Sequence, residues 1–140
     1  SFSVSKLHAQ TAEDSVKATI NQMFAAMKGT NAKALLGCFA DRSTLQTVLR
    51  DKQGKIIVRS EPITEFVKQV ASMPKDAGDE RIIFDAIKID GAMASVWAPY
   101  KFYYNGKFSH CGVNNFVLVK LGSQWKIQYI IDTRRRVGCE

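Results

Sequence analysis

The chain has 140 residues, of which 46% are hydrophobic and 24% are charged. This composition is typical of a globular protein, and the length favours one domain. Lysine and arginine exceed aspartate and glutamate by 20 − 13 = 7, but apart from three consecutive arginines at 134–136 the basic residues are scattered. The sequence shows no nucleic-acid-binding module, and no apolar run reaches the ~18 residues of a membrane helix. We therefore expect neither nucleic acid nor a membrane as partner.

Residues 1–10 show neither a helical nor a strand period. They resemble the polar end of an export signal, with cleavage near Ala9 or Gln10, and the alternative is a disordered tail. Export predicts a periplasmic or secreted protein, whereas a plain tail leaves a cytoplasmic one. A single domain is then expected over residues 11–136, with a short C-terminal tail at 137–140.

The first half of the chain predicts three helices. Thr11 can cap the first helix, whose apolar residues recur at helical spacing up to Gly29. Asn31 can cap a short second helix that carries apolar residues up to Phe39. A hairpin with strands at 43–50 and 55–59 follows, and Pro62 marks the start of a third helix. Residues 75–80 are predicted to form a polar loop.

The second half predicts strands at 81–89, 92–104, 107–120 and 124–133, because these runs are rich in β-branched and aromatic residues. Asp90-Gly91 and Asn105-Gly106 are strong signals for two-residue hairpin turns, and a short loop surrounds Gly122-Ser123. The sequence thus predicts an α+β fold, with three N-terminal helices packed on a strongly curved, mostly antiparallel sheet of about six strands.

The predicted turns assign side chains to the two faces of the sheet. A two-residue turn at Asn105-Gly106 pairs Tyr103 with Phe108 and Trp97 with Asn114, and one at Asp90-Gly91 pairs Phe84 with Trp97. One face then carries aromatic and polar residues: Phe84, Trp97, Tyr103, Phe108, His110, Asn114 and Phe116. The other is mainly aliphatic: Ile83, Ile87, Val96, Ala98, Tyr100, Cys111, Val113 and Val117. We expect the aromatic face to enclose a cavity for a small molecule, and the aliphatic face to pair with a second copy.

His110 is the candidate general acid or base, and Asp132 could orient its ring. A two-residue turn at Gly122-Ser123 would place Asp132 on the opposite face from His110, whereas a longer turn or a bulge would place both on one face. The alternatives are a packing role for His110 and an ion pair between Asp132 and a nearby arginine. The expected ligand-binding residues are Trp97, Tyr103, Phe84, Asn114, Lys101, Phe24 and Arg134.

The cysteines are Cys38, Cys111 and Cys139. They form no CxxC pair, so we expect no zinc site. One disulfide can form, most simply from Cys139, and the sequence leaves its partner open. The two histidines, His8 and His110, are far apart in the chain, and we expect no metal and no cofactor.

Several motifs carry a family resemblance that covers residues 11–136. They are Ile20-Asn21-Gln22-Met23-Phe24-Ala25-Ala26-Met27, Leu35-Leu36-Gly37-Cys38-Phe39-Ala40-Asp41, Val96-Trp97-Ala98-Pro99-Tyr100, Phe108-Ser109-His110-Cys111-Gly112-Val113, Gln124-Trp125-Lys126-Ile127 and Ile131-Asp132-Thr133-Arg134-Arg135. Together they resemble the nuclear transport factor 2-like superfamily, whose cone-shaped fold is also called cystatin-like. The closer resemblance is to its lumazine-binding and polyketide-cyclase-like subgroup.

The resemblance implies a conical pocket, but not the chemistry of the superfamily's ketosteroid isomerases. Those enzymes use a tyrosine and an aspartate, and the matching positions here hold Met23 and Thr47, which can neither stabilise an oxyanion nor abstract a carbon-bound proton near neutral pH. We therefore expect a small-molecule-binding domain. The alternatives are a cyclase- or isomerase-type acid–base enzyme using His110, with or without Asp132, and a protein-interaction module acting through the sheet face.

Overall fold

The computed structural model describes residues 11–140. The predicted export signal at residues 1–10, and His8 within it, therefore lie outside the described part of the chain. Among the described residues, no helix is both long and apolar enough to cross a membrane.

Three helices precede most of the sheet: α1 (Ala12–Lys28), α2 (Ala32–Gly37) and α3 (Ile63–Ser72). The predicted caps are confirmed, because Thr11 Oγ1 accepts the backbone N–H of Asp14 at 3.1 Å and Asn31 Oδ1 accepts that of Ala34 at 3.1 Å. These bonds satisfy amides that a helix leaves without partners in its first turn. Phe39 was expected in the second helix but begins a strand instead.

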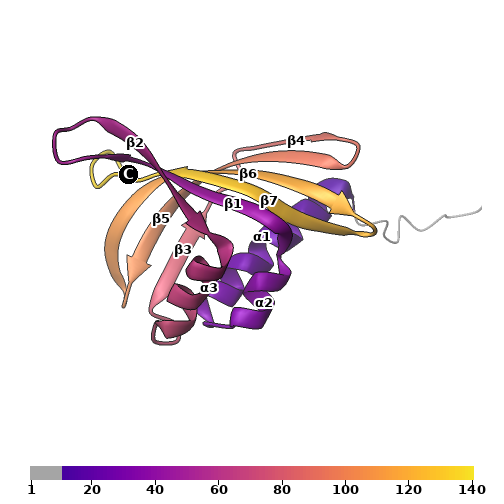
Figure 1. The fold of residues 1–140 in the computed structure, drawn as a ribbon, viewed down its shortest axis with the longest axis horizontal. Helices are drawn as coiled ribbons and strands as arrows, with labels where there is room; N and C mark the ends of the chain where they lie inside the picture. Colours follow the sequence, from indigo (N-terminus) through magenta and orange to yellow (C-terminus); the bar gives the residue numbers. More distant parts are fainter. Residues whose placement is uncertain (1–10) are drawn as a thin grey trace, which may run out of the picture.

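Seven strands form one curved sheet: β1 (Phe39–Arg50), β2 (Ile56–Pro62), β3 (Gly78–Ile82), β4 (Ala86–Asp90), β5 (Met93–Tyr104), β6 (Lys107–Leu121) and β7 (Gln124–Thr133). Their order is β2-β1-β7-β6-β5-β3, with β4 also pairing with β5. Only β1 and β7 run parallel. The α+β prediction is confirmed, and the three helices lie together on one side of the sheet (Figure 1).

The strand predicted at 81–89 is in fact two strands, β3 and β4, which pair with different parts of β5. Residues 83–85 lie between the two strands, and the pairing is irregular there, although Ile83 and Asp85 still donate backbone hydrogen bonds to Pro99 and Trp97. In addition, β3 begins at Gly78, so part of the predicted polar loop at 75–80 belongs to the sheet. Glu80 therefore belongs to strand β3 and not to a loop.

The core lies between the helices and the concave face of the sheet. Phe24 of α1 meets Phe116 of β6 edge to face, with ring centroids 6.2 Å apart. Fully burying one large apolar side chain stabilises the fold by about 1.5–3 kcal/mol. The largest fully buried side chains are Phe116, Ile20, Leu35, Leu118, Ile127, Val16 and Val96.

A β-bulge near the Asn105-Gly106 turn overturns the predicted face of β5. Tyr103 pairs with Phe108 as predicted, but the register then shifts, so that Phe102 pairs with His110 and Ser109 is the extra residue. A shift of one residue moves every later side chain to the other face. Trp97 consequently pairs with Asn115, and its predicted position on the same face as Asn114 is wrong.

The pairing predicted around Asp90-Gly91 is also wrong. Trp97 pairs with Ala86 across the β4–β5 hairpin, not with Phe84, because Asp90 pairs with Met93 and the turn lies one residue later than expected.

A second bulge, in β7, decides the position of Asp132. Leu121 pairs with Gln124, as a two-residue turn requires, but the register shifts between Leu118 and Val117. Asp132 therefore pairs with Asn114. Directly paired residues point to the same face of a sheet, so Asp132 shares the concave face with Asn114 and His110. The turn at Gly122-Ser123 is thus a two-residue turn, and the predicted alternative of a bulge, which places Asp132 and His110 on one face, is confirmed.

Candidate functional site

A cavity of about 90 Å³ opens into the cone between the sheet and helices α1 and α3. Sites for drug-sized ligands usually enclose ~300–1,000 Å³, so this cavity suits a smaller molecule. Its apolar wall is made by Met23, Met27, Leu45, Phe66 and Ile130. Its polar wall is made by Gln46, Thr47, Arg59, Glu61, Glu80, Asn114, Asp132 and Arg134. With Phe66 as its one aromatic side chain, it is not the aromatic-lined pocket that we predicted.

Asp132 accepts three hydrogen bonds at the end of β7. Thr47 Oγ1 donates to Oδ1 at 2.7 Å, and Tyr100 Oη and Arg134 Nε lie 3.0 and 3.2 Å from Oδ2. The Arg134 contact is also an ion pair, and the side chain of Asp132 is largely buried. A buried carboxylate is stabilised by such donors and by an opposite charge. These contacts fix the Asp132 carboxylate in position.

Gly112 allows β7 to reach this site. A Cβ atom on Gly112 would lie 2.0 Å from the carbonyl oxygen of Thr133. The same oxygen lies 2.7 Å from Tyr100 Oη. Burial and the negative charges of Asp132 and Glu80 raise the pKa of the Tyr100 phenol, so this group stays a neutral donor.

Glu80 is the second carboxylate of the cavity. Asn114 Nδ2 donates a 2.7 Å hydrogen bond to Glu80 Oε2. The pKa of Glu80 is raised to about 7. Burial is the main cause and the charge of Asp132 adds to it, while the bond from Asn114 and the charge of Arg134 act in the opposite direction. A carboxyl group with this pKa exists in both protonation states near neutral pH.

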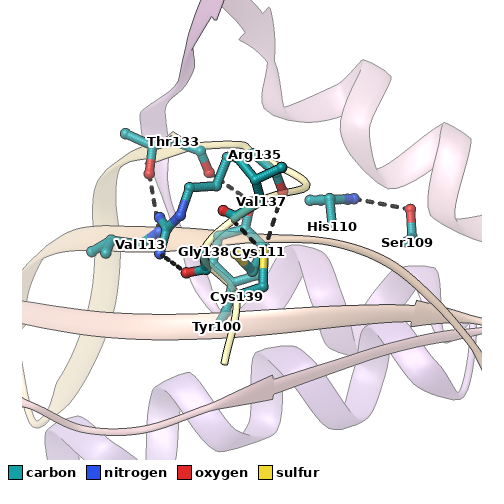
Figure 2. The surroundings of a disulfide bond; sticks show 10 residues. All are labelled: Tyr100, Ser109, His110, Cys111, Val113, Thr133, Arg135, Val137, Gly138 and Cys139. Carbon is teal, nitrogen blue, oxygen red and sulfur yellow. Dashed lines mark hydrogen bonds between the residues drawn. A yellow bond between two sulfur atoms is a disulfide. The ribbon is translucent and has the colours of Figure 1, made fainter.

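His110 lies on the concave face but does not line this cavity. Its ring packs against Tyr100 and Phe102, with centroids 5.7 and 5.1 Å away, and its Nδ1 lies 3.0 Å from Ser109 Oγ (Figure 2). Burial lowers the pKa of His110, as do nearby arginines, against the opposing charge of Asp132. No hydrogen bond joins His110 to Asp132 within the described chain, so the expected pair is not formed.

Of the other expected ligand-binding residues, two line the cavity, two pack against the core and three lie on the outer face. Asn114 and Arg134 line the cavity. Phe24 and Phe84 pack against the core, and Lys17 lies over the Phe84 ring.

Trp97, Tyr103 and Lys101 lie on the outer face instead, because of the bulge at Ser109. Trp97 is 47% exposed. Arg81 stacks over Tyr103 at 4.0 Å from the ring centroid. The prediction that these three side chains enter the cone is therefore wrong.

Glu80 was not among the predicted site residues, although its position two residues before Ile82 fits strand alternation. The polar residues before it were interpreted as a loop over 75–80, whereas β3 already begins at Gly78. Met27, Leu45, Phe66 and Ile130 were likewise not proposed as cavity residues, since an apolar side chain at regular spacing reads equally well as core.

The C-terminal segment is fastened to the sheet beside this site. Cys139 forms a disulfide with Cys111 of β6, and Arg135 exchanges two backbone hydrogen bonds with Cys111 (Figure 2). Arg134, the ion-pair partner of Asp132, lies in the chain between the end of β7 at Thr133 and Arg135, which is bonded to Cys111. The predicted disulfide from Cys139 is confirmed and its partner is Cys111, whereas Cys38 is a free, buried thiol whose pKa is raised by burial.

Clusters of three or more His, Cys, Asp or Glu side chains that could hold a metal ion are not found within residues 11–140.

The fold is that of known nuclear transport factor 2-like proteins. An NTF2-like protein of unknown function from Shewanella baltica superposes with a TM-score of 0.70 at 15% identity, covering 88% of this chain and 93% of that one. Another from Methylobacillus flagellatus gives 0.69 at 19% identity, covering 93% and 96%. A domain of unknown function with a cystatin-like fold from Nostoc punctiforme gives 0.68 at 16% identity, covering 90% and 78%.

The protein thus has the cystatin-like α+β cone fold that these NTF2-like proteins share. The sequence itself matches no protein-family model and no curated protein. At these identities the structural similarity defines the fold and leaves the ligand open.

Proposed function

We propose that the protein is a small-molecule-binding domain and that its ligand occupies the cavity inside the cone. One observation carries this proposal: an apolar wall of Met23, Met27 and Leu45 faces a polar group made by Glu80 and Asn114. Ligand sites typically combine an apolar surface with a few fixed polar groups, which orient the ligand.

A fragment screen tests this function. Small amines, carboxylic acids, ketones and heteroaromatic compounds, lumazine among them, are added to the protein and the melting temperature is measured. We expect at least one class to stabilise the wild type and to lose its effect in Met27→Trp, which fills the cavity. Binding of lumazine would support the lumazine-binding subgroup. A screen in which no compound stabilises the protein would contradict the proposed function.

A second candidate is an acid–base enzyme, favoured by the pKa of about 7 for Glu80. In this proposal Glu80 replaces His110 as the proton-transfer group, because Glu80 lines the cavity. The Glu80 carboxylate takes a proton from the carbon beside a substrate carbonyl, and Arg134 stabilises the enolate oxygen. The test is deuterium exchange into small ketones, followed by NMR: exchange should be lost in Glu80→Gln and kept in His110→Gln.

We also propose that the outer face of the sheet pairs with a second copy of the chain. A shallow apolar hollow on this face is lined by Val48, Trp97, Val113 and Ile131, among others, and exposed apolar patches commonly mark interfaces. Sedimentation equilibrium should give a dimer for the wild type and a monomer for Trp97→Arg. A monomeric wild type would contradict the dimer and leave this face free for another protein, as the interaction-module alternative requires.

We propose a periplasmic or secreted location, for which the Cys111–Cys139 disulfide is the support. Disulfides persist in oxidising compartments and are rare in the cytosol. Thiol alkylation of the protein from its natural cells under denaturing conditions without reductant, followed by mass spectrometry, should label Cys38 alone. Labelling of all three cysteines would favour the cytoplasmic alternative.

A further inference from the structure

The charges around the cone cavity do not balance. Five ionisable side chains line it: Arg59, Glu61, Glu80, Asp132 and Arg134. With every carboxylate ionised they carry two positive and three negative charges, which sum to −1. Two of the carboxylates, Glu61 and Glu80, have no Lys, Arg or His nitrogen of residues 11–140 within 4.0 Å. Both are partly buried, and of the two it is Glu80 whose pKa is raised by burial.

The groups nearest Glu80 do not neutralise it. Asn114 supplies a neutral donor at 2.7 Å. The guanidinium of Arg134 is already paired with Asp132 at 3.2 Å. Tyr100 donates to Asp132 and stays uncharged. The remaining two residues, Arg59 and Glu61, come from the edge strand β2; their charges sum to zero, but they form no ion pair with each other within 4.0 Å.

An ionised carboxylate without a cationic partner is costly to bury. It can be neutralised by a proton or by a cation. A cationic ligand would replace the proton and restore the balance of the cavity wall. The Phe66 ring in the same wall is also better suited to a cation than to an anion. An anionic ligand, in contrast, would add to the excess negative charge.

We propose that the ligand of the cone cavity is a small apolar amine, bound as its ammonium ion with Glu80 as the counter-ion. The ammonium group faces the Glu80 carboxylate, and the hydrocarbon part lies against Met23, Met27 and Leu45. This inference rests on the proposed ligand-binding function and names its ligand class.

Three probes of matched shape but different charge test the inference: isobutylamine, isobutanol and isobutyrate. Each is titrated into 15N-labelled protein at pH 8, and the dissociation constant is taken from amide shifts around the cavity. We expect isobutylamine to bind at least tenfold more tightly than isobutanol, and isobutyrate not to bind. At pH 5.5 the amine must displace a proton from Glu80, so its affinity should fall by about tenfold or more.

Glu80→Gln removes the charge and keeps the shape and the acceptor for Asn114. This variant should bind isobutylamine no better than isobutanol, and binding of the alcohol should be unchanged, which shows that the cavity is intact. Glu13→Gln, which removes the same charge from an exposed site at the start of α1, is the matched control and should behave as the wild type.

The results separate this inference from the function on which it rests. Isobutanol or isobutyrate binding as tightly as the amine, or equal amine affinity in Glu80→Gln, would overturn the amine assignment while leaving a ligand-binding cavity. Failure of all three probes would overturn the assignment too, and the fragment screen would then decide whether the cavity binds any ligand.

Discussion

Asn114 Nδ2 donates a 2.7 Å hydrogen bond to Glu80 Oε2, and this bond joins β6 to β3 across the intervening strand β5. The bond orients the carboxylate toward the cavity but brings no positive charge. Burial raises the pKa of Glu80, and the bond from Asn114 offsets this only in part, so that the proton of Glu80 is linked to both stability and ligand binding.

The first prediction concerns stability and pH. The pKa of Glu80 rises from an ordinary 4.5 to about 7 on folding, so the folded state holds a proton that the unfolded chain releases. The stabilisation by this group is fully present below pH 4.5 and is lost as the pH rises through 7. The free energy of unfolding should fall by about 3 kcal/mol from this cause across the interval.

Urea unfolding of wild type and Glu80→Gln at pH 5 and pH 8 measures this effect. The variant should gain stability relative to the wild type at pH 8. The lowered pKa of His110 acts with the opposite sign, because stability from a depressed histidine is lost as the pH falls. His110 is present in both proteins and cancels in the comparison. An equal stability difference at the two pH values would contradict the prediction.

The second prediction concerns the coupling of the two carboxylates. The negative charge of Asp132 raises the pKa of Glu80. Replacing it in Asp132→Asn should therefore move the Glu80 pKa below 7, which a 13C NMR titration of the glutamate carboxyl carbon can measure. Asp90→Asn removes a charge from the distant β4–β5 hairpin and should leave the titration unchanged. A Glu80 pKa that stays at the wild-type value in Asp132→Asn would show that burial alone sets it.

The architecture was predictable because its signals are local. The caps at Thr11 and Asn31, and the strand composition after Arg81, specify helices and strands through contacts within a few residues. The site was harder to predict, since it depends on strand phase. One extra residue, Ser109, moves Trp97 from the predicted pocket to the outer face, and no residue type marks such a bulge in a single sequence.

The role of Glu80 could not be predicted from the sequence for a different reason. Its chemistry comes from burial beside Asn114, 34 positions away in the chain, and from the absence of an ion-pair partner within the described residues. These are properties of the assembled sheet. His110, in contrast, was predicted as the acid or base because histidine ordinarily titrates near neutral pH, yet it does not line the cavity.

The third prediction concerns Gly112. A Cβ at this position would lie 2.0 Å from the backbone oxygen of Thr133, far inside contact distance. Gly112→Ala must therefore push β7 away and break the contact of Thr133 with Tyr100. We expect a loss of at least ~2 kcal/mol in the free energy of unfolding. Thermal or urea unfolding measures it.

Gly37→Ala is the matched control for Gly112→Ala. No atom lies within 4 Å of a Cβ at Gly37, and the residue ends helix α2. Alanine favours a helix over glycine by up to ~1 kcal/mol, so this variant should be as stable as the wild type or more so. If both variants unfolded alike, the close approach at Gly112 would not be the cause.

The last prediction concerns the Cys111–Cys139 disulfide, which closes a loop of 28 residues in sequence. A cross-link of this span restricts the unfolded chain and stabilises the fold by about 3–4 kcal/mol in the chain-entropy model. Cys139→Ser should lower the free energy of unfolding by this amount. Dithiothreitol should destabilise the wild type to the same extent and leave Cys139→Ser unaffected.

Since the disulfide fastens the segment that carries Arg134, reduction should also weaken the ion pair with Asp132, and the Glu80 titration should change with it. A wild type whose stability is insensitive to dithiothreitol, after mass spectrometry has shown that both thiols are free, would contradict this role.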